Sequence, residues 1–153
     1  MTAPLNLRSA EMADADLLLL WRNDLETRKA SHNMEEVLIE SHFAWLDASL
    51  KSPQKRRLWI AEIDGKAVGT CRADKLDNAW ELSWTVAPDA RGKGVAHQML
   101  SKLVHYFNEP LMAQIKVNNI ASIKVAERAG FVLDTQEHGV LFYVYPNASS
   151  MAH

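Results

Sequence analysis

The sequence lacks the features that mark several large classes of protein. Its 153 residues contain one cysteine, Cys71, so the chain cannot form an internal disulfide, and we expect a reducing compartment. No apolar run approaches the roughly 18 residues that span a bilayer, and LLLLW at residues 17–21 is far too short. The six histidines show neither HExxH spacing nor a paired Cys/His pattern, so we expect no metal.

The charge and the length of the chain narrow the remaining classes. A formal net charge of −2 and a pI near 6.3 give no overall attraction to nucleic acid. The opening segment MTAPLNLRSAEM lacks the basic-then-apolar order of a signal peptide, so we expect a cytoplasmic protein without a membrane partner. With no repeat or long linker, we expect one domain over residues 1–146 and a flexible tail, residues 147–153.

Hydrophobic periodicity predicts a chain that alternates between strands and helices. Leu5–Arg8 is a short strand, Asp14 or Asp16 opens a helix through LLLLWRND, and Val37–Leu50 is a second helix. A hairpin is predicted around Asp64-Gly65. The later elements are a strand at 79–86, a helix to about Asn108, a strand at 111–117, a helix after Asn119, and two strands joined at Gly139. The order β-α-α-β-β-β-α-β-α-β-β predicts a mixed α/β fold.

The segment RGKGVA, residues 91–96, separates the strand ending at Val86 from a helix-patterned stretch. A helix that begins at such a loop presents unpaired N–H groups and the positive end of its dipole, which favour a phosphate. Gly92 and Gly94 matter because a residue without Cβ lets the backbone bend sharply and approach a phosphate closely. The loop therefore predicts a phosphate-bearing cofactor.

The spacing within this loop argues against the two common nucleotide motifs. A Rossmann fingerprint requires a small residue where His97 stands and an acid about 20 positions on, and a Walker loop requires GxxxxGK followed by Ser or Thr. The pattern that remains is [Q/R]xxGx[G/A], met by Arg91, Gly94 and Ala96. A second segment, Val117–Phe131, contains Asn119 as a helix N-cap and Gly130 as the residue that ends the helix.

These two segments, in this order, resemble the GNAT superfamily of acyl-CoA-dependent N-acetyltransferases. The resemblance implies a central mixed sheet of about seven strands with helices on both faces, and acetyl-CoA as co-substrate. It also implies direct transfer of acetyl to a primary amine in a ternary complex, with a homodimer among the options for the assembly. The residues implied to contact coenzyme A are Val86 through its amide, Arg91, Gly92, Lys93, Gly94, Val95, Ala96, Asn119 and Ser122.

Three residues are candidates for moving protons. Glu81 matches the position of the general base in many GNAT proteins and shares a strand face with Ser83 and Thr85, but an ion pair with Arg72 or Lys75 is an equal alternative. Many relatives carry a Tyr that protonates the thiolate, where this chain has Ala126. Ser122, Tyr143 or water could replace it, although aromatic strand packing is the simpler account of Tyr143.

The N-terminal third resembles the GNAT branch that acetylates amino sugars of nucleotide-linked glycan pathways. The resemblance rests on WRND at 21–24 and SHFAWL at 41–46. It implies that the substrate contacts Arg22, Asn23, Arg28, His42 and Trp45, with an arginine on a phosphate and a Trp face against a sugar. Core packing of Trp21, Trp45 and His42 is the alternative. The rival functions are N-terminal acetylation of a ribosomal protein and non-catalytic binding of acyl-CoA.

Overall fold

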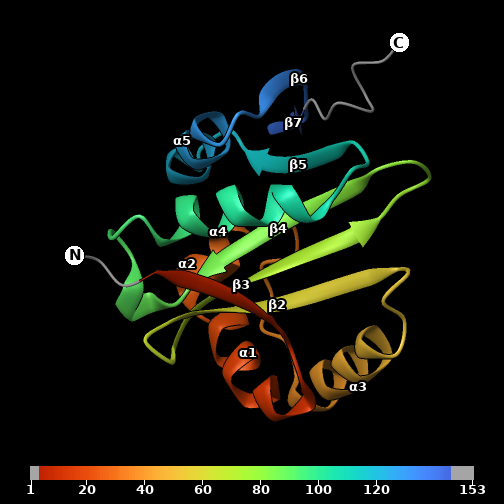
Figure 1. Ribbon diagram of the computed structural model, residues 1–153, viewed down its shortest axis with the longest axis vertical. Helices are drawn as coiled ribbons and strands as arrows, with labels where there is room; N and C mark the ends of the chain where they lie inside the picture. Colours follow the sequence, from red (N-terminus) through yellow and green to blue (C-terminus); the bar gives the residue numbers. More distant parts are fainter. Residues whose placement is uncertain (1–3, 146–153) are drawn as a thin grey trace.

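The computed structural model describes residues 4–145, which fold around a seven-stranded sheet (Figure 1). The strand order is β1-β2-β3-β4-β5-β7-β6, and within these residues every neighbouring pair is antiparallel except β4 and β5. The strands are β1 (Leu5–Ser9), β2 (Arg56–Ile63), β3 (Lys66–Lys75), β4 (Trp80–Val86), β5 (Leu111–Lys116), β6 (Val132–Glu137) and β7 (Val140–Tyr145). The predicted mixed sheet of about seven strands is confirmed. The predicted tail, residues 147–153, lies outside the described residues.

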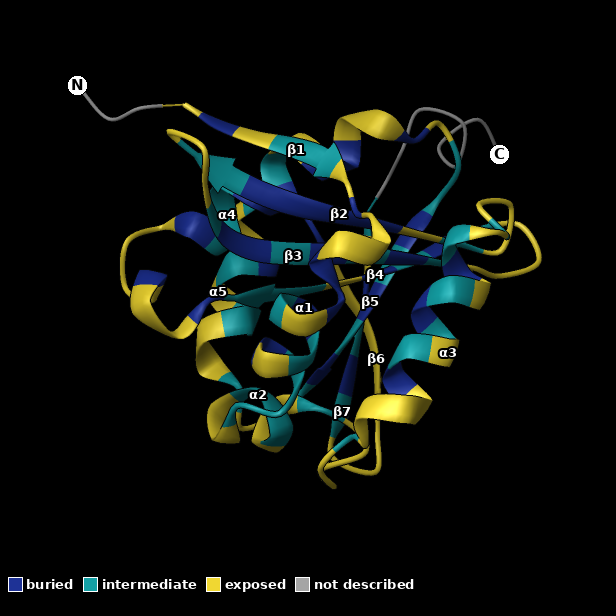
Figure 2. Ribbon diagram, turned by 90° about the horizontal axis from the view of Figure 1, so that it is seen from below, coloured by how far each residue is buried: buried dark blue, intermediate teal, exposed yellow. Residues whose placement is uncertain are grey.

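Helices cover both faces of this sheet. They are α1 (Ala15–Arg22), α2 (Leu25–Ala30), α3 (Ile39–Leu50), α4 (Val95–Leu103) and α5 (Ile120–Arg128). On one face α4 packs so closely that a Cβ added to Gly69 of β3 would lie 2.8 Å from the Met99 sulfur. The opposite face carries Thr70 and Arg72 of β3 and faces α1 and α3 across a cavity. Figure 2 shows the burial this produces, with dark-blue residues along β2 and β3 and an exposed edge at β6.

The predicted turn and cap chemistry is confirmed at three places. Asp64 and Gly65 adopt φ values of 52° and 76°, the two left-handed residues that a tight β2–β3 hairpin requires. The Asn119 side chain accepts a hydrogen bond from the Ser122 amide at 3.2 Å and so caps α5. Gly130, at φ 104°, ends α5, and the Phe131 N–H donates to the Ala126 carbonyl at 2.9 Å.

The N-terminal helices differ from the prediction. The helix α2 was not predicted, and Asp24 caps it by accepting from the Thr27 amide at 3.2 Å. The next helix begins at Ile39 and not at Val37, because the Asn23 side chain bonds both the N–H and the carbonyl of Val37, at 2.7 and 2.9 Å. The first helix does begin directly after Asp14, as predicted, at Ala15. The Asp14 carboxylate makes no cap hydrogen bond to α1; it pairs with Arg8 at 2.7 Å and accepts from the Glu11 N–H at 2.8 Å, which caps the preceding 3-10 turn.

The helix after the glycine loop is also shorter than predicted. It ends at Leu103 and is followed by a 3-10 turn at Val104–Tyr106, so it does not reach Asn108. The buried side of α4 is formed by Met99, Leu100 and Leu103, all fully buried. The strand that precedes the loop and the helix that follows it are thus both fixed by the core.

The parallel strands β4 and β5 separate soon after they meet. Their pairing covers Trp80 with Leu111 and Glu81 with Met112, and among residues 4–145 no further pair joins them. The Trp80 N–H donates toward β5, to the Pro110 carbonyl, whereas the Ala87 N–H donates to Val68 on the β3 side. Because N–H directions alternate along a strand, the amides of Trp84 and Val86 point into the space that β5 has left.

Candidate active site

A groove of about 790 Å³ follows the gap between β4 and β5. We call it the loop groove, because one end is formed by the glycine loop, residues 91–96, and the opposite wall by α5. Gly92 and Gly94 have φ values of 77° and 76°, and a Cβ built on either would meet no atom within 4 Å. The helix α4 begins at Val95, so its first N–H groups face the same space. This end of the groove can hold an anion against main-chain amides.

Arg91 connects the glycine loop to the helix that the sequence did not predict. Its Nη2 donates to the Asp24 carboxylate and lies 3.4 Å from the Thr27 hydroxyl. This guanidinium holds the pKa of Asp24 below its usual range. The contact places α2 beside the loop groove, where Glu26 and Thr27 form part of the wall.

The structure brings most of the predicted cofactor residues together. Those that line the loop groove are Val86, Arg91, Gly92, Gly94, Val95, Ala96, Asn119 and Ser122. Lys93 is the exception, since it is absent from the described lining and its ammonium points back to the Asp89 carbonyl at 3.4 Å. His97, Lys124 and Arg128 add basic side chains to the same groove.

Glu81 lies on the wall of the loop groove. Its Oε1 accepts a hydrogen bond from Gln114 Nε2 at 3.1 Å. The alternative ion pairs do not form among residues 4–145, because Arg72 pairs with Asp74 at 2.7 Å and the Lys75 ammonium lies over the Trp80 ring. The β3–β4 register places Glu81 on the same sheet face as Ser83 and Thr85, in agreement with the predicted alternation.

The residues that could protonate the departing thiolate differ in burial and in their position relative to the cavities. Ala126 is fully buried, whereas Ser122 lines the loop groove. Tyr143 is 1% exposed and lines neither cavity; its hydroxyl donates to Glu127 at 2.9 Å. Burial and the Glu127 carboxylate raise the pKa of Tyr143 to about 12. Tyr143 is therefore packed within the fold, away from both cavities.

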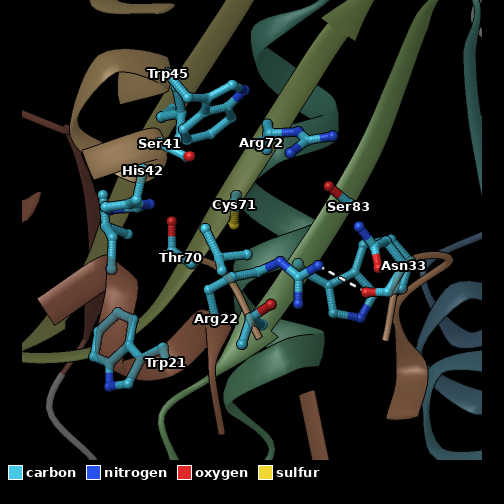
Figure 3. A pocket seen from close by; sticks show the side chains of 15 residues that line it. Trp21, Arg22, Asn33, Ser41, His42, Trp45, Thr70, Cys71, Arg72 and Ser83 are labelled. Atoms are coloured by element: carbon cyan, nitrogen blue, oxygen red, sulfur yellow. Dashed lines mark hydrogen bonds between the residues drawn. The ribbon is translucent and has the colours of Figure 1, made fainter. Parts of the chain in front are cut away.

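A second cavity of about 460 Å³ lies between α1, α3 and strands β3 and β4 (Figure 3). We call it the arginine pocket, after Arg22 and Arg72 in its wall. His42, 5% exposed, donates from Nε2 to the Ala15 carbonyl at 3.0 Å, and burial lowers the pKa of its imidazole. The Trp45 ring is stacked on the His42 ring, with 6.1 Å between the ring centroids, and lies under the Arg56 and Arg72 guanidinium groups. The Trp45 ring therefore already contacts protein groups.

The predicted substrate residues divide between this pocket and structural roles. Arg22, His42 and Trp45 line the arginine pocket, but Asn23 and Arg28 do not. The Asn23 side chain is engaged with Val37, and Arg28 Nε donates to the Met34 carbonyl at 3.0 Å. Polar lining residues that the sequence did not single out as site residues include Asn33, Ser41, Thr70, Arg72 and Ser83. Polar residues alternating along one face of a central strand could have indicated Thr70 and Arg72.

The two cavities adjoin along β4. Six residues line both: Arg22, Asn33, Arg72, Ser83, Trp84 and Thr85. A ligand bound along the loop groove and a ligand in the arginine pocket would therefore meet at the same short stretch of β4, near the amides of Trp84 and Val86 that point into the gap beside β5.

A family model, the acetyltransferase (GNAT) domain, matches residues 5–132. The chain belongs to the GNAT acetyltransferase family. It is thus an N-acetyltransferase, and the resemblance seen in the glycine loop and in α5 is confirmed. No curated protein matches the chain in sequence.

Solved structures share the fold of this acetyltransferase over nearly its whole length. The ribosomal-protein-alanine N-acetyltransferase of Brucella melitensis has a TM-score of 0.77 and 28% identity, over 91% of this chain and 98% of that chain. RimL, a ribosomal L7/L12 alpha-N-protein acetyltransferase solved with coenzyme A, has a TM-score of 0.81 and 16% identity over 94% of each chain. A Vibrio cholerae spermidine N-acetyltransferase, with coenzyme A and spermine, has a TM-score of 0.79 and 15% identity over 92% of each chain.

Two further properties of the acetyltransferase concern its cysteine and the length of its helices. Cys71 is 1% exposed, and burial raises the pKa of its thiol to about 12, so at neutral pH it is not a thiolate nucleophile. Among residues 4–145, no helix combines the length and the apolar character that crossing a membrane would require.

Proposed function

We propose that this acetyltransferase moves an acetyl group from acetyl-CoA directly to the primary amine of a small molecule, such as an amino sugar, in a ternary complex. The observation that carries the proposal is the junction of the loop groove and the arginine pocket along β4. A donor and an acceptor bound in the two cavities can be held together there, which converts a bimolecular step into an intramolecular one.

The loop groove fits coenzyme A. Acetyl-CoA supplies the acetyl group as an activated thioester. The first N–H groups of α4 would hold its diphosphate, and the open space beside Gly92 and Gly94 leaves room for a close approach. The amides of Trp84 and Val86, which pair with no strand among residues 4–145, would bind the pantetheine arm and the thioester carbonyl, where negative charge develops during the transfer.

Two proton movements are assigned to residues of the loop groove. Glu81 would accept a proton from the acceptor amine through a water, because it lines the loop groove but not the arginine pocket. Ser122 or water would return a proton to the thiolate, since Ala126 offers no donor. The raised pKa of Cys71 keeps its thiol protonated, so this residue is a poor carrier of the acetyl group. The chain has no second cysteine, and both facts support direct transfer.

Acetyl-CoA binding and acceptor use test the proposal separately. Calorimetry with coenzyme A tests the groove, and we expect one binding site per chain. A screen of amines that measures release of free coenzyme A then tests the acceptor, and we expect small amines to be acetylated. Tight coenzyme A binding with no acetylation of any small amine would contradict the acceptor part alone.

N-terminal acetylation of a protein is a second candidate. It is favoured by the Brucella melitensis neighbour, which is named for acetylation of a ribosomal protein and shares 28% identity. Peptides with a free N-terminal alanine or serine, compared with amino sugars at equal concentration, separate the two. A kcat/KM at least tenfold higher for the peptides would favour the protein substrate.

A further inference from the structure

We propose that the acceptor carries a small anionic group, a carboxylate or a phosphate, near its amine, and that Arg22 and Arg72 bind this group together. The inference rests on the proposed function, because it specifies the acceptor for the same site. It also separates this acetyltransferase from enzymes that act on polyamines.

The charge of the arginine pocket supports this inference. Its described lining contains two arginines and His42, but no aspartate or glutamate from residues 4–145. Asp74, which pairs with both Arg56 and Arg72, lies outside that lining. A polycationic acceptor needs carboxylates for its ammonium groups, whereas this wall would repel them.

Arg22 is a cation without a counterion in the described part of the chain. Among residues 4–145 it forms no ion pair, and its Nη2 donates only to the Asn33 carbonyl at 2.8 Å (Figure 3). Its Nη1 is buried and has no hydrogen-bond partner among these residues. Burial, followed by the nearby charges of Arg72 and Arg28, lowers the pKa of the Arg22 guanidinium. A buried, unpaired donor of this kind is stabilised by an anion that accepts from it.

Arg72 is held so that its end can share the same anion. Its Nε donates to Asp74 at 2.7 Å and its guanidinium lies over the Trp45 ring at 5.5 Å. These two contacts orient the side chain, and its terminal nitrogens form no hydrogen bond with residues 4–145. Figure 3 shows Arg72 and Arg22 reaching toward the same opening, with Ser83 beside them. Both arginines line both cavities, so a bound anion would lie next to the transfer point.

Matched pairs of probes test the inference by calorimetry on the protein saturated with coenzyme A. Glucosamine 6-phosphate is compared with glucosamine for the phosphate, and serine with serinamide for the carboxylate; spermidine is the polycationic probe. We expect the anionic member of at least one pair to bind at least about tenfold more tightly than its partner, which is the strength of one charge-assisted contact. The pair that shows the difference identifies the anion.

Three variants assign that difference to the two arginines. Arg22→Gln and Arg72→Gln should each abolish the preference, whereas Arg57→Gln should keep it, because Arg57 lies over Trp80 outside both cavities. If Arg22→Gln does not fold, Arg22→Lys takes its place in the comparison, because it keeps the charge but loses the planar fork. Equal binding within both pairs, failure of both anionic probes to bind, or tighter binding of spermidine overturns the inference. Coenzyme A binding, measured on the same samples, reports separately on the proposed function.

Discussion

Substitution of Gly94 by valine tests the glycine loop most directly. Gly94 is the N-cap of α4 with φ 76° and ψ 14°, a conformation in which a side chain costs about 1–2 kcal/mol. If the loop relaxes to relieve this strain, the amides at the start of α4 turn away from the groove. Loss of two charge-assisted hydrogen bonds, each worth about 1.5–3 kcal/mol, corresponds to coenzyme A binding weakened by about 100-fold or more.

Gly65 provides a matched control for this substitution. It has the same φ of 76°, and a Cβ built there also meets no atom within 4 Å, but it lies in the β2–β3 hairpin and lines neither cavity. Gly65→Val should therefore lower the melting temperature by a similar amount and leave coenzyme A affinity unchanged. Calorimetry with coenzyme A on both variants is the assay. Unchanged affinity in Gly94→Val, or equal losses in the two variants, would refute the role of the loop.

Three further predictions concern proton transfer and the loop. Glu81→Gln should lower kcat about 100-fold and change KM by a smaller factor. The loss of kcat should be largest at pH values where the amine is protonated. A pH–rate profile identical to that of the unsubstituted enzyme would remove Glu81 from the mechanism. Ser122→Ala should lower kcat by roughly tenfold. Tyr143→Phe should leave kcat unchanged and lower the free energy of unfolding by about 1 kcal/mol, because it removes one hydrogen bond. A larger loss of kcat in Tyr143→Phe than in Ser122→Ala would contradict the packing role of Tyr143. Arg91 lowers the pKa of Asp24, so the ion pair stabilises the fold above the usual Asp pKa of about 3.9 and loses this effect as the pH falls through the lowered folded-state value. The difference in urea midpoint between the unsubstituted protein and Asp24→Asn, which keeps the cap, should therefore shrink as the pH is lowered from 7 to 3, and a constant difference would contradict this account.

The best-predicted parts of the chain are those whose signals are local. The Asp64-Gly65 hairpin, the cap at Asn119 and the end of α5 at Gly130 each depend on residues within a few positions of one another. Side-chain hydrogen bonds to nearby amides and left-handed backbone conformations can be recognised from such short segments. The glycine loop belongs to this group, since both its glycines have the left-handed conformation that the loop requires, and α4 begins at Val95, two residues before the predicted helical stretch.

The parts that were missed depend on contacts between distant segments. The short helix α2 buries none of its residues and is held through Asp24 by Arg91, 67 positions away. Asn23 was expected to bind substrate, but Val37 occupies its side chain. Neither pairing leaves a periodic pattern in the sequence, so propensity and spacing did not reveal them.

The sequence by itself determined the order of the seven strands and of every helix except α2, the glycine loop and the family that the chain belongs to, because these follow from local backbone chemistry and short motifs. Only the tertiary structure decided which polar side chains face one another: Arg22 of α1 and Arg72 of β3 share a cavity wall although 50 residues separate them. The point at which β4 separates from β5, after Glu81, was likewise visible only in the structure. Site geometry of this kind is set by packing between elements, which a linear pattern does not record.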